Sequence, residues 1–180
     1  MSRKGNKIIK KEPSVEVSQA DNIVRIKGKK GELEVLLREN FSVDVTELSL
    51  KIVNKDEGKN SKAYHGMYQS QIQNAVTGVT DGYSKELELF GVGYKVQKKG
   101  KGLEFSLGYS HPVLVPEQEG IDFETDGPTK LKISGIDKQK VGQVAAEIIK
   151  LRDARKDPYK TKGIKFKGAV IRRKAGKKVK

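Results

Sequence analysis

The sequence predicts an α+β fold of two tandem, similar modules, each an antiparallel sheet with one helix packed on a face, plus a basic C-terminal extension. Three observations predict it: a hairpin pattern that occurs twice, a helix pattern after each copy, and positive charge gathered at the end of the chain. We place the modules at residues 1–81 and 82–180, and the basic extension at about residues 153–180.

The repeat joins residues 24–37 to residues 94–107, at a constant offset of 70 residues. Ile26 corresponds to Val96, and Leu33 corresponds to Leu103. Each copy alternates apolar and polar residues, breaks at a Lys/Gly cluster and alternates again. This pattern is typical of two half-buried strands joined by a hairpin turn, in which glycine supplies the positive φ.

A further strand pattern follows each hairpin, at residues 48–53 and at residues 131–133. A helix pattern comes next in both copies. The second helix has Asp137 as a possible cap and an apolar stripe at helical spacing: Val141, Val144, Ala145 and Ile148. The first should begin near Asn60 or Ser61 and end near Gly78 or Gly82. Its stripe is less regular: Met67, Ile72, Ala75, Val76 and Val79.

Composition favours a soluble protein of a reducing, cytosolic compartment. The 180 residues contain no cysteine, which excludes disulfides and thiolate zinc sites. No apolar run approaches the roughly 18 residues of a membrane span, and no secretory signal pattern follows Met1. The formal net charge of +14 points to an anionic partner.

The charge is concentrated at one end. Residues 150–180 carry fourteen Lys/Arg and two acids, whereas residues 13–149 are nearly neutral, with eighteen basic and twenty acidic side chains. Such an end can neutralise phosphates and release their counterions, which drives nucleic-acid binding. Tyr159 lies among cations, and its ring can stack on a base or sugar. The competing interpretation is a solvated tail.

The candidate RNA-binding residues therefore lie mostly in this end: Arg152, Arg155, Lys156, Tyr159, Lys160, Lys162, Lys165, Lys167, Arg172, Arg173, Lys174 and Lys177. Secondary candidates are Lys95 and Lys98 at the second hairpin, and His111 before Pro112. Residues 156–164 are expected to form an extended loop because Pro158 disfavours helix at Asp157. Phe166, Val170 and Ile171 suggest a short strand beyond it.

Other classes of site find little support. Gly28-Lys29-Lys30-Gly31 matches the GXXG of a KH module, but it joins strands rather than helices. Gly91-Val92-Gly93 lacks the third glycine and the helix of a dinucleotide loop. His65 and His111 have no metal-ligand spacing, and no catalytic motif occurs. We expect no cofactor, no metal and no small-molecule substrate.

Two other function classes remain open from the residues alone. A basic adaptor docking on an acidic membrane or an acidic protein surface would also need a cationic end, although this end lacks the Trp/Phe/Leu face of an interfacial helix. An enzyme would require a bound metal or a cleft with strongly shifted carboxylates.

Several stretches resemble the bacterial-type large-subunit ribosomal protein six family. One of them is Asp157-Pro158-Tyr159-Lys160-Thr161-Lys162-Gly163-Ile164, which resembles the family's signature loop. The others follow in family order: 26–33, 78–83, 89–94, 106–113 and 135–146. In this chain Thr161 stands where the family usually has glycine, and Lys156 stands where it has a small residue or proline.

The resemblance implies two tandem α+β domains and binding to large-subunit (23S) rRNA through the second domain and its basic end. It implies a position near the stalk base, close to the sarcin–ricin region where translation factors act. We therefore predict a structural constituent of the large ribosomal subunit in the cytoplasm, with no enzymatic role. Its expected partners are 23S rRNA and neighbouring ribosomal proteins, with no membrane.

Overall fold

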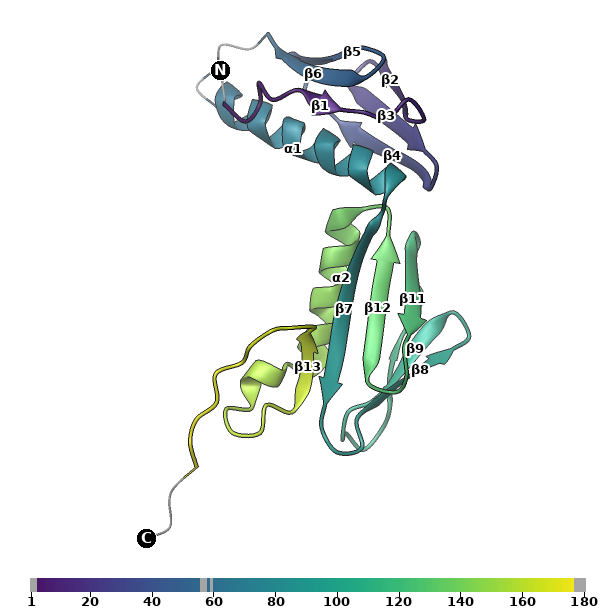
Figure 1. Ribbon diagram of the computed structural model, residues 1–180, viewed down its shortest axis with the longest axis vertical. Helices are drawn as coiled ribbons and strands as arrows, with labels where there is room; N and C mark the ends of the chain where they lie inside the picture. The colour runs from purple at the N-terminus through teal and green to yellow at the C-terminus, as the bar shows by residue number, and fades with distance from the viewer. Residues whose placement is uncertain (1–2, 56–57, 59, 177–180) are drawn as a thin grey trace. The chain divides into compact units, whose positions relative to one another are not determined.

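A computed structural model describes residues 3–55, 58 and 60–176. It divides into two compact units, Met1–Gly82 with Ile136–Lys138 and Tyr83–Gly135 with Gln139–Lys180. Helices and antiparallel sheets make up both units (Figure 1). The predicted α+β fold of tandem modules is thereby confirmed.

The first unit contains two three-stranded sheets and one long helix. One sheet has the order β1-β6-β5, with β1 at Ile9–Lys10, β5 at Phe41–Val45 and β6 at Ser49–Asn54. The other has the order β2-β3-β4, with β2 at Glu16–Ala20, β3 at Ile23–Gly28 and β4 at Gly31–Leu36. Helix α1, Ser61–Thr80, packs against β3, β4 and β6 and so covers both sheets (Figure 1).

The second unit repeats this plan with one extra strand. A four-stranded sheet has the order β11-β12-β7-β13: β7 is Tyr83–Phe90, β11 is Ile121–Thr125, β12 is Lys130–Gly135 and β13 is Gly163–Phe166. A three-stranded sheet has the order β10-β9-β8: β8 is Lys95–Lys99, β9 is Gly102–Ser106 and β10 is Val113–Val115. Helix α2, Lys138–Leu151, is followed by the short 3-10 helix η1, Ala154–Lys156.

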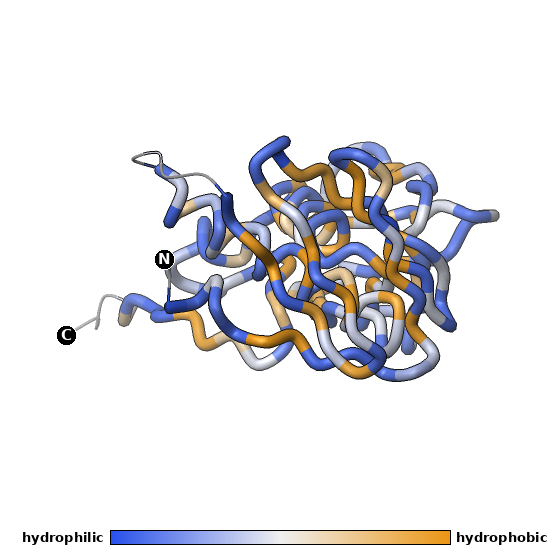
Figure 2. Tube along the Cα trace, turned by 90° about the horizontal axis from the view of Figure 1, so that it is seen from above, coloured by the Kyte–Doolittle hydropathy of each residue, from blue (hydrophilic) through white to orange (hydrophobic). Residues whose placement is uncertain are grey.

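Each module thus has two sheets where the sequence pattern indicated one, because edge strands such as β1 and β10 are too short to show periodicity. Both cores are apolar. Leu87, Phe105, Ile133, Ile148 and Ile164 are fully buried in the second core. Alternation of hydrophobic and hydrophilic residues along the strands accounts for this burial (Figure 2).

The turn of the second hairpin lies one residue later in the repeat than the turn of the first. Gly28 faces Gly31 in the first, which leaves Lys29 and Lys30 as the turn, whereas Lys99 faces Gly102 in the second. The second turn therefore begins at Gly100, whose φ is 61°. The first residue of this two-residue turn has positive φ, a conformation that glycine adopts without steric cost.

The first helical stripe contained one error. Met67 is 40% exposed, while Tyr68 is buried against Phe41 with ring centroids 5.0 Å apart. Tyr68 precedes Ile72 by four residues and so shares its face, but Met67 precedes it by five and points elsewhere. The stripe of α2 is buried as predicted at Val141, Val144, Ala145 and Ile148.

The predicted strand near the C-terminus is also shifted. β13 ends at Phe166, and Val170 is 98% exposed. A turn intervenes, in which the Ala169 amide donates to the Phe166 carbonyl at 3.0 Å and Gly168 has a φ of 75°. Val170 and Ile171 therefore do not extend the sheet. Over the residues described, neither helix combines the length and the apolar character that a membrane crossing needs.

Candidate nucleic-acid interface

The segment between α2 and β13 is fixed at both ends (Figure 1). At its C-terminal end, the Ile164 amide donates to the Arg152 carbonyl at 2.7 Å, and β13 pairs antiparallel with β7. Gly163 makes this approach possible, because a Cβ atom there would lie 2.4 Å from the Arg152 carbonyl oxygen. The loop is consequently a continuation of the core rather than a free tail.

Asp157 organises the loop. Its Oδ1 accepts the amides of Tyr159 and Lys160, each at 3.1 Å, and its Oδ2 accepts the amide of Lys162 at 3.2 Å. The bonds from the Lys160 and Lys162 amides are the main cause of a lowered pKa for Asp157. The loop is therefore a compact turn around a carboxylate. Asp157 is extended, as the following proline predicted, but the expectation of an extended chain was wrong for the turn at residues 158–160.

Thr161 closes the turn with a left-handed backbone. Its φ is 51°, a conformation that costs a non-glycine residue about 1–2 kcal/mol. The side chain is buried, and its hydroxyl donates to the Lys160 carbonyl at 2.8 Å. Thr161 therefore adopts the positive-φ turn conformation even though it is not glycine.

The turn presents its cations and its ring outward. Tyr159 is 58% exposed, and Lys160 is exposed beside it. Within residues 3–55, 58 and 60–176, the side chains of Lys156, Lys160 and Lys162 make no hydrogen bond or ion pair. The Lys174 amide donates to the Pro158 carbonyl at 2.8 Å, which brings the following basic segment back to the same turn.

Arg172, Arg173 and Lys174 are exposed on that segment, and none of their side chains has a partner in the part of the chain that the structure describes. Lys177, also predicted to bind RNA, lies outside the described residues. The structure thus gathers six predicted cations near one turn: Lys156, Lys160, Lys162, Arg172, Arg173 and Lys174.

Arg152 lies against two aromatic rings. Its guanidinium carbon is 4.9 Å from the centroid of Tyr109 and 5.5 Å from that of Tyr94. The Tyr109 hydroxyl donates to the Leu151 carbonyl at 2.9 Å. These contacts restrict the Arg152 side chain at the end of α2, because stacked guanidinium groups have fewer rotamers.

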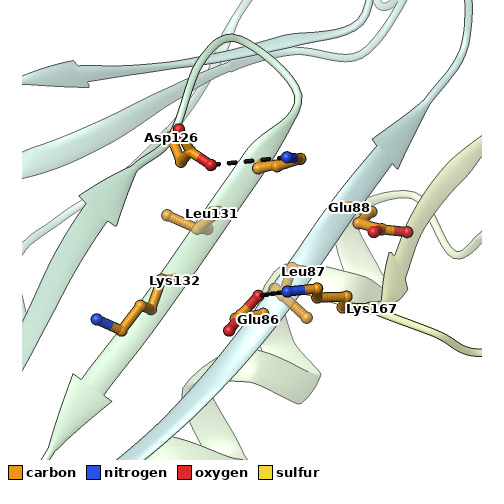
Figure 3. A pocket seen from close by; sticks show the side chains of 8 residues that line it. Glu86, Leu87, Glu88, Asp126, Leu131, Lys132 and Lys167 are labelled. Carbon is orange, nitrogen blue, oxygen red and sulfur yellow. Dashed lines mark hydrogen bonds and ion pairs between the residues drawn. The ribbon is translucent and has the colours of Figure 1, made fainter.

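Three other predicted cations are paired within the protein. Arg155 makes a forked contact with Asp153, its closest N–O distance being 2.8 Å. This hydrogen-bonded pair lowers the pKa of Asp153 and raises that of Arg155. Lys167 bonds Glu86 at 2.5 Å, as Figure 3 shows, and the Lys165 ammonium is 3.9 Å from Glu88. Pairing offsets the charge that these residues could offer to a phosphate.

The secondary candidates lie elsewhere. Lys95 and Lys98 belong to β8, in the other sheet of the same unit, and Lys98 donates to the Phe123 carbonyl at 3.4 Å. His111 is exposed in the β9–β10 loop, with its Nδ1 3.4 Å from the Ser110 hydroxyl. None of the three contacts the Asp157 turn in any interaction we observe among the described residues.

Sequence reasoning missed the role of Asp157, which it treated only as a residue biased by the following proline. An aspartate at the start of a turn often accepts hydrogen bonds from the backbone amides two and three residues later. This known pattern could have predicted the role of Asp157. It also missed Tyr109, whose bond to Leu151 spans 42 residues. No local sequence pattern predicts a contact between residues so far apart in the sequence.

The two histidines singled out in the sequence lie apart from any metal-ligand cluster among the described residues. No cluster of three or more His, Asp or Glu side chains there could hold a metal ion. His65 is a core residue, 2% exposed, with its Nε2 3.1 Å from the Ile52 carbonyl.

Comparison with protein-family models gives a match over most of the chain. The model described as ribosomal protein L6 matches residues 13–82 and 90–167. The two matched segments cover parts of both compact units, and the second includes the Asp157 turn and β13.

Proposed function

The chain belongs to the ribosomal protein L6 family, large-subunit ribosomal proteins that bind rRNA, and on that premise we propose that it binds 23S rRNA near the stalk base. There it stabilises RNA tertiary structure beside the sarcin–ricin region, in contact with neighbouring ribosomal proteins. The family is one of structural ribosomal proteins rather than enzymes. The protein acts on the ribosome, in the cytoplasm.

The observation that carries this proposal is the Asp157 turn. It holds Tyr159 and Lys160 exposed with the half-buried Lys162 close by in sequence, and the Asp157 carboxylate is occupied by backbone amides. Cations without an internal partner are available to phosphates, and an exposed ring can stack on a base or ribose. Double-stranded RNA shows few readable base edges, so the contacts are mainly to backbone and shape.

The two units have different tasks in this proposal. The unit made of residues 82–180 supplies the RNA contacts. The unit made of residues 1–81 has a nearly balanced set of charges once the N-terminal lysines are set aside, so it contributes less to RNA affinity.

The test is crosslinking in cells followed by identification of the bound RNA. The expected result is enrichment of 23S rRNA segments near the stalk base and the sarcin–ricin region. Recovery of another RNA, or co-sedimentation with another particle, contradicts the proposal.

Removal of residues 150–180 would be a poor test, because it also removes β13 and the fully buried Ile164. Loss of assembly would then follow from unfolding of the second unit. A crosslinking series with Lys160→Gln and Lys162→Gln leaves the core intact and tests the interface itself.

A further inference from the structure

A hollow of about 320 Å³ lies at the C-terminal end of α2 and is lined in part by the Asp157 turn, at Asp157 and Lys162 rather than at the exposed Tyr159 and Lys160. Its walls come from Tyr109 and from the segment between Lys150 and Lys162. This volume is at the lower end of the range found for ligand pockets, about 300–1,000 Å³. All of these residues belong to one compact unit.

Basic side chains outnumber acidic ones in the lining of the hollow. Four cations face two carboxylates: Lys150, Arg152, Lys156 and Lys162 against Asp153 and Asp157. Both carboxylates are already engaged, Asp153 by the forked contact with Arg155 and Asp157 by three backbone amides. Within the described residues, no acid forms an ion pair with any of the four cations. The pocket therefore favours an anion.

The C-terminal end of a helix normally disfavours anions, because its last carbonyl groups carry partial negative charge. Here two of these carbonyls are occupied. The Leu151 carbonyl accepts the Tyr109 hydroxyl at 2.9 Å, and the Arg152 carbonyl accepts the Ile164 amide at 2.7 Å. The opposing field at this end of α2 is weakened accordingly.

Arg152 is suited to a phosphate in particular. Its guanidinium lies within 5.5 Å of the centroids of both Tyr109 and Tyr94, and these contacts limit the orientations of its fork of donors. Planar, bidentate donation matches the two unbridged oxygens of a phosphodiester. Lys150, Lys156 and Lys162 add point charges around it.

We propose that this hollow is a phosphate-binding pocket that holds one phosphodiester group of the bound RNA, with Arg152 as the forked donor, Lys150 as a second cation and Tyr109 as the positioning residue. The inference rests on the proposed function, since it names the group of the RNA that the second unit captures. It adds Lys150 and Tyr109 to the RNA-binding surface.

The test compares Lys150→Gln with Lys140→Gln, an equal change of charge at an exposed position on the same helix, outside the pocket. RNA affinity is measured against salt with the 23S rRNA segment recovered by crosslinking. The expected result is that Lys150→Gln reduces the salt slope by roughly one unit and Lys140→Gln leaves it unchanged. Equal slopes for the two variants overturn the pocket.

Arg152→Lys tests the fork, because it keeps the charge and removes the planar donor pair. A loss of affinity of about fivefold or more at constant slope is expected for one lost bidentate contact. Tyr109→Phe retains the ring but releases the Leu151 carbonyl, so it should weaken binding in the same direction. Unchanged affinity in both variants contradicts the assigned roles.

A second arm separates RNA from free phosphate. Inorganic phosphate is titrated into the protein alone while the amide signals of Arg152, Lys156 and Lys162 are followed by NMR. The proposal expects saturable shifts that Lys150→Gln weakens, together with the RNA effect above. Phosphate shifts without any RNA effect mean a site for free phosphate, which overturns the inference but leaves the proposed function intact.

Failure of the wild-type protein to bind 23S rRNA would instead contradict the proposed function. The pocket inference would then be overturned as well, because it names a phosphodiester group of that RNA.

Discussion

Two regions of the second unit carry lysines in similar number but use them differently. On one face of the β11-β12-β7-β13 sheet, four lysines alternate with four acids. Figure 3 shows part of this set, including Glu86, Glu88, Asp126, Lys132 and Lys167. Lys132 bonds Glu124 at 2.8 Å, Lys167 bonds Glu86 at 2.5 Å, Lys130 is 3.6 Å from Asp126 and Lys165 is 3.9 Å from Glu88. The Asp157 turn instead pairs its carboxylate with backbone amides and leaves its lysines unpaired.

The difference shows that the partner of each carboxylate decides whether a neighbouring cation is available. Exposed ion pairs contribute little to stability, with a median of about 0–1 kcal/mol. They do cancel the field that a phosphate would feel. A count of lysines in the sequence therefore overstates the RNA-binding charge, and the positions of acids correct it.

The largest expected effect belongs to the turn. Lys160→Gln combined with Lys162→Gln should flatten the salt dependence of 23S rRNA binding by about two units. Counted from a common affinity at about 1 M salt, this corresponds at about 0.1 M salt to a loss of affinity of about 100-fold. Filter binding or fluorescence anisotropy over a salt series measures both quantities. An unchanged slope would show that the two lysines are not in the interface, and it would contradict the difference between the turn and the sheet face.

Asp157→Ala gives the next effect, and its sign is informative. A purely electrostatic view expects tighter RNA binding, since one negative charge is lost. The structure predicts weaker binding, by about five- to tenfold, because three amides lose their acceptor and the turn is no longer ordered before binding.

Asp157→Asn is the matched control for that experiment. It removes the same charge but retains a side-chain oxygen that can accept the Tyr159 and Lys160 amides. Its affinity should lie between those of the wild type and Asp157→Ala. Tighter binding by both variants would show that the carboxylate acts only as a repelling charge.

Acid should loosen the same turn at a predictable pH. The pKa values of Asp153 and Asp157 are lowered from an ordinary 3.8 by hydrogen bonds from Arg155 and from backbone amides respectively. Because the folded pKa lies below the unfolded one, the stabilisation is present above pH 3.8 and is lost as the pH falls through the folded value. NMR shifts of the Tyr159 and Lys160 amides in the free protein should thus stay constant until the pH drops below 3.8. A midpoint at or above that of the urea-unfolded chain contradicts the assignment.

The smallest effect on RNA binding is expected for lysines on the sheet face where lysines and acids are paired. Lys165→Gln combined with Lys167→Gln should change RNA affinity by less than about twofold and the slope by less than about half a unit, because each lysine is already opposed by a carboxylate. The same binding assay measures it. A slope change comparable with that of the Lys160 and Lys162 variant would show that the pairs open on binding.

Periodicity in the sequence predicted the parts of this protein that depend on local pattern. The α2 stripe and both hairpins were predicted, since a buried face of a helix or strand imposes its own period on nearby residues. Tyr68 rather than Met67 completes the α1 face, because the irregular stripe left two adjacent apolar residues to choose from.

The remaining features depend on pairing across long stretches of chain. Antiparallel pairing of β13 with β7 sets Lys165 opposite Glu88, and it brings Lys167 to Glu86, 81 residues away. No repeat or spacing in the sequence encodes that register. The sequence predicted that the turn at Asp157 would be a cationic loop. The left-handed backbone of Thr161 and the hydrogen bonds to the Asp157 carboxylate could be seen only in the folded structure.

The alternating charges on the sheet face have a consequence for how the protein meets its partner. A surface whose charges cancel in pairs has almost no field beyond the short distance that separates the paired charges, whereas the unpaired lysines attract an anion out to about one Debye length, roughly 8–10 Å. The second unit consequently has an electric polarity, and a diffusing RNA exerts a torque on it before contact. Encounters that bring the turn to the RNA are thereby favoured, which reduces the number of misoriented collisions.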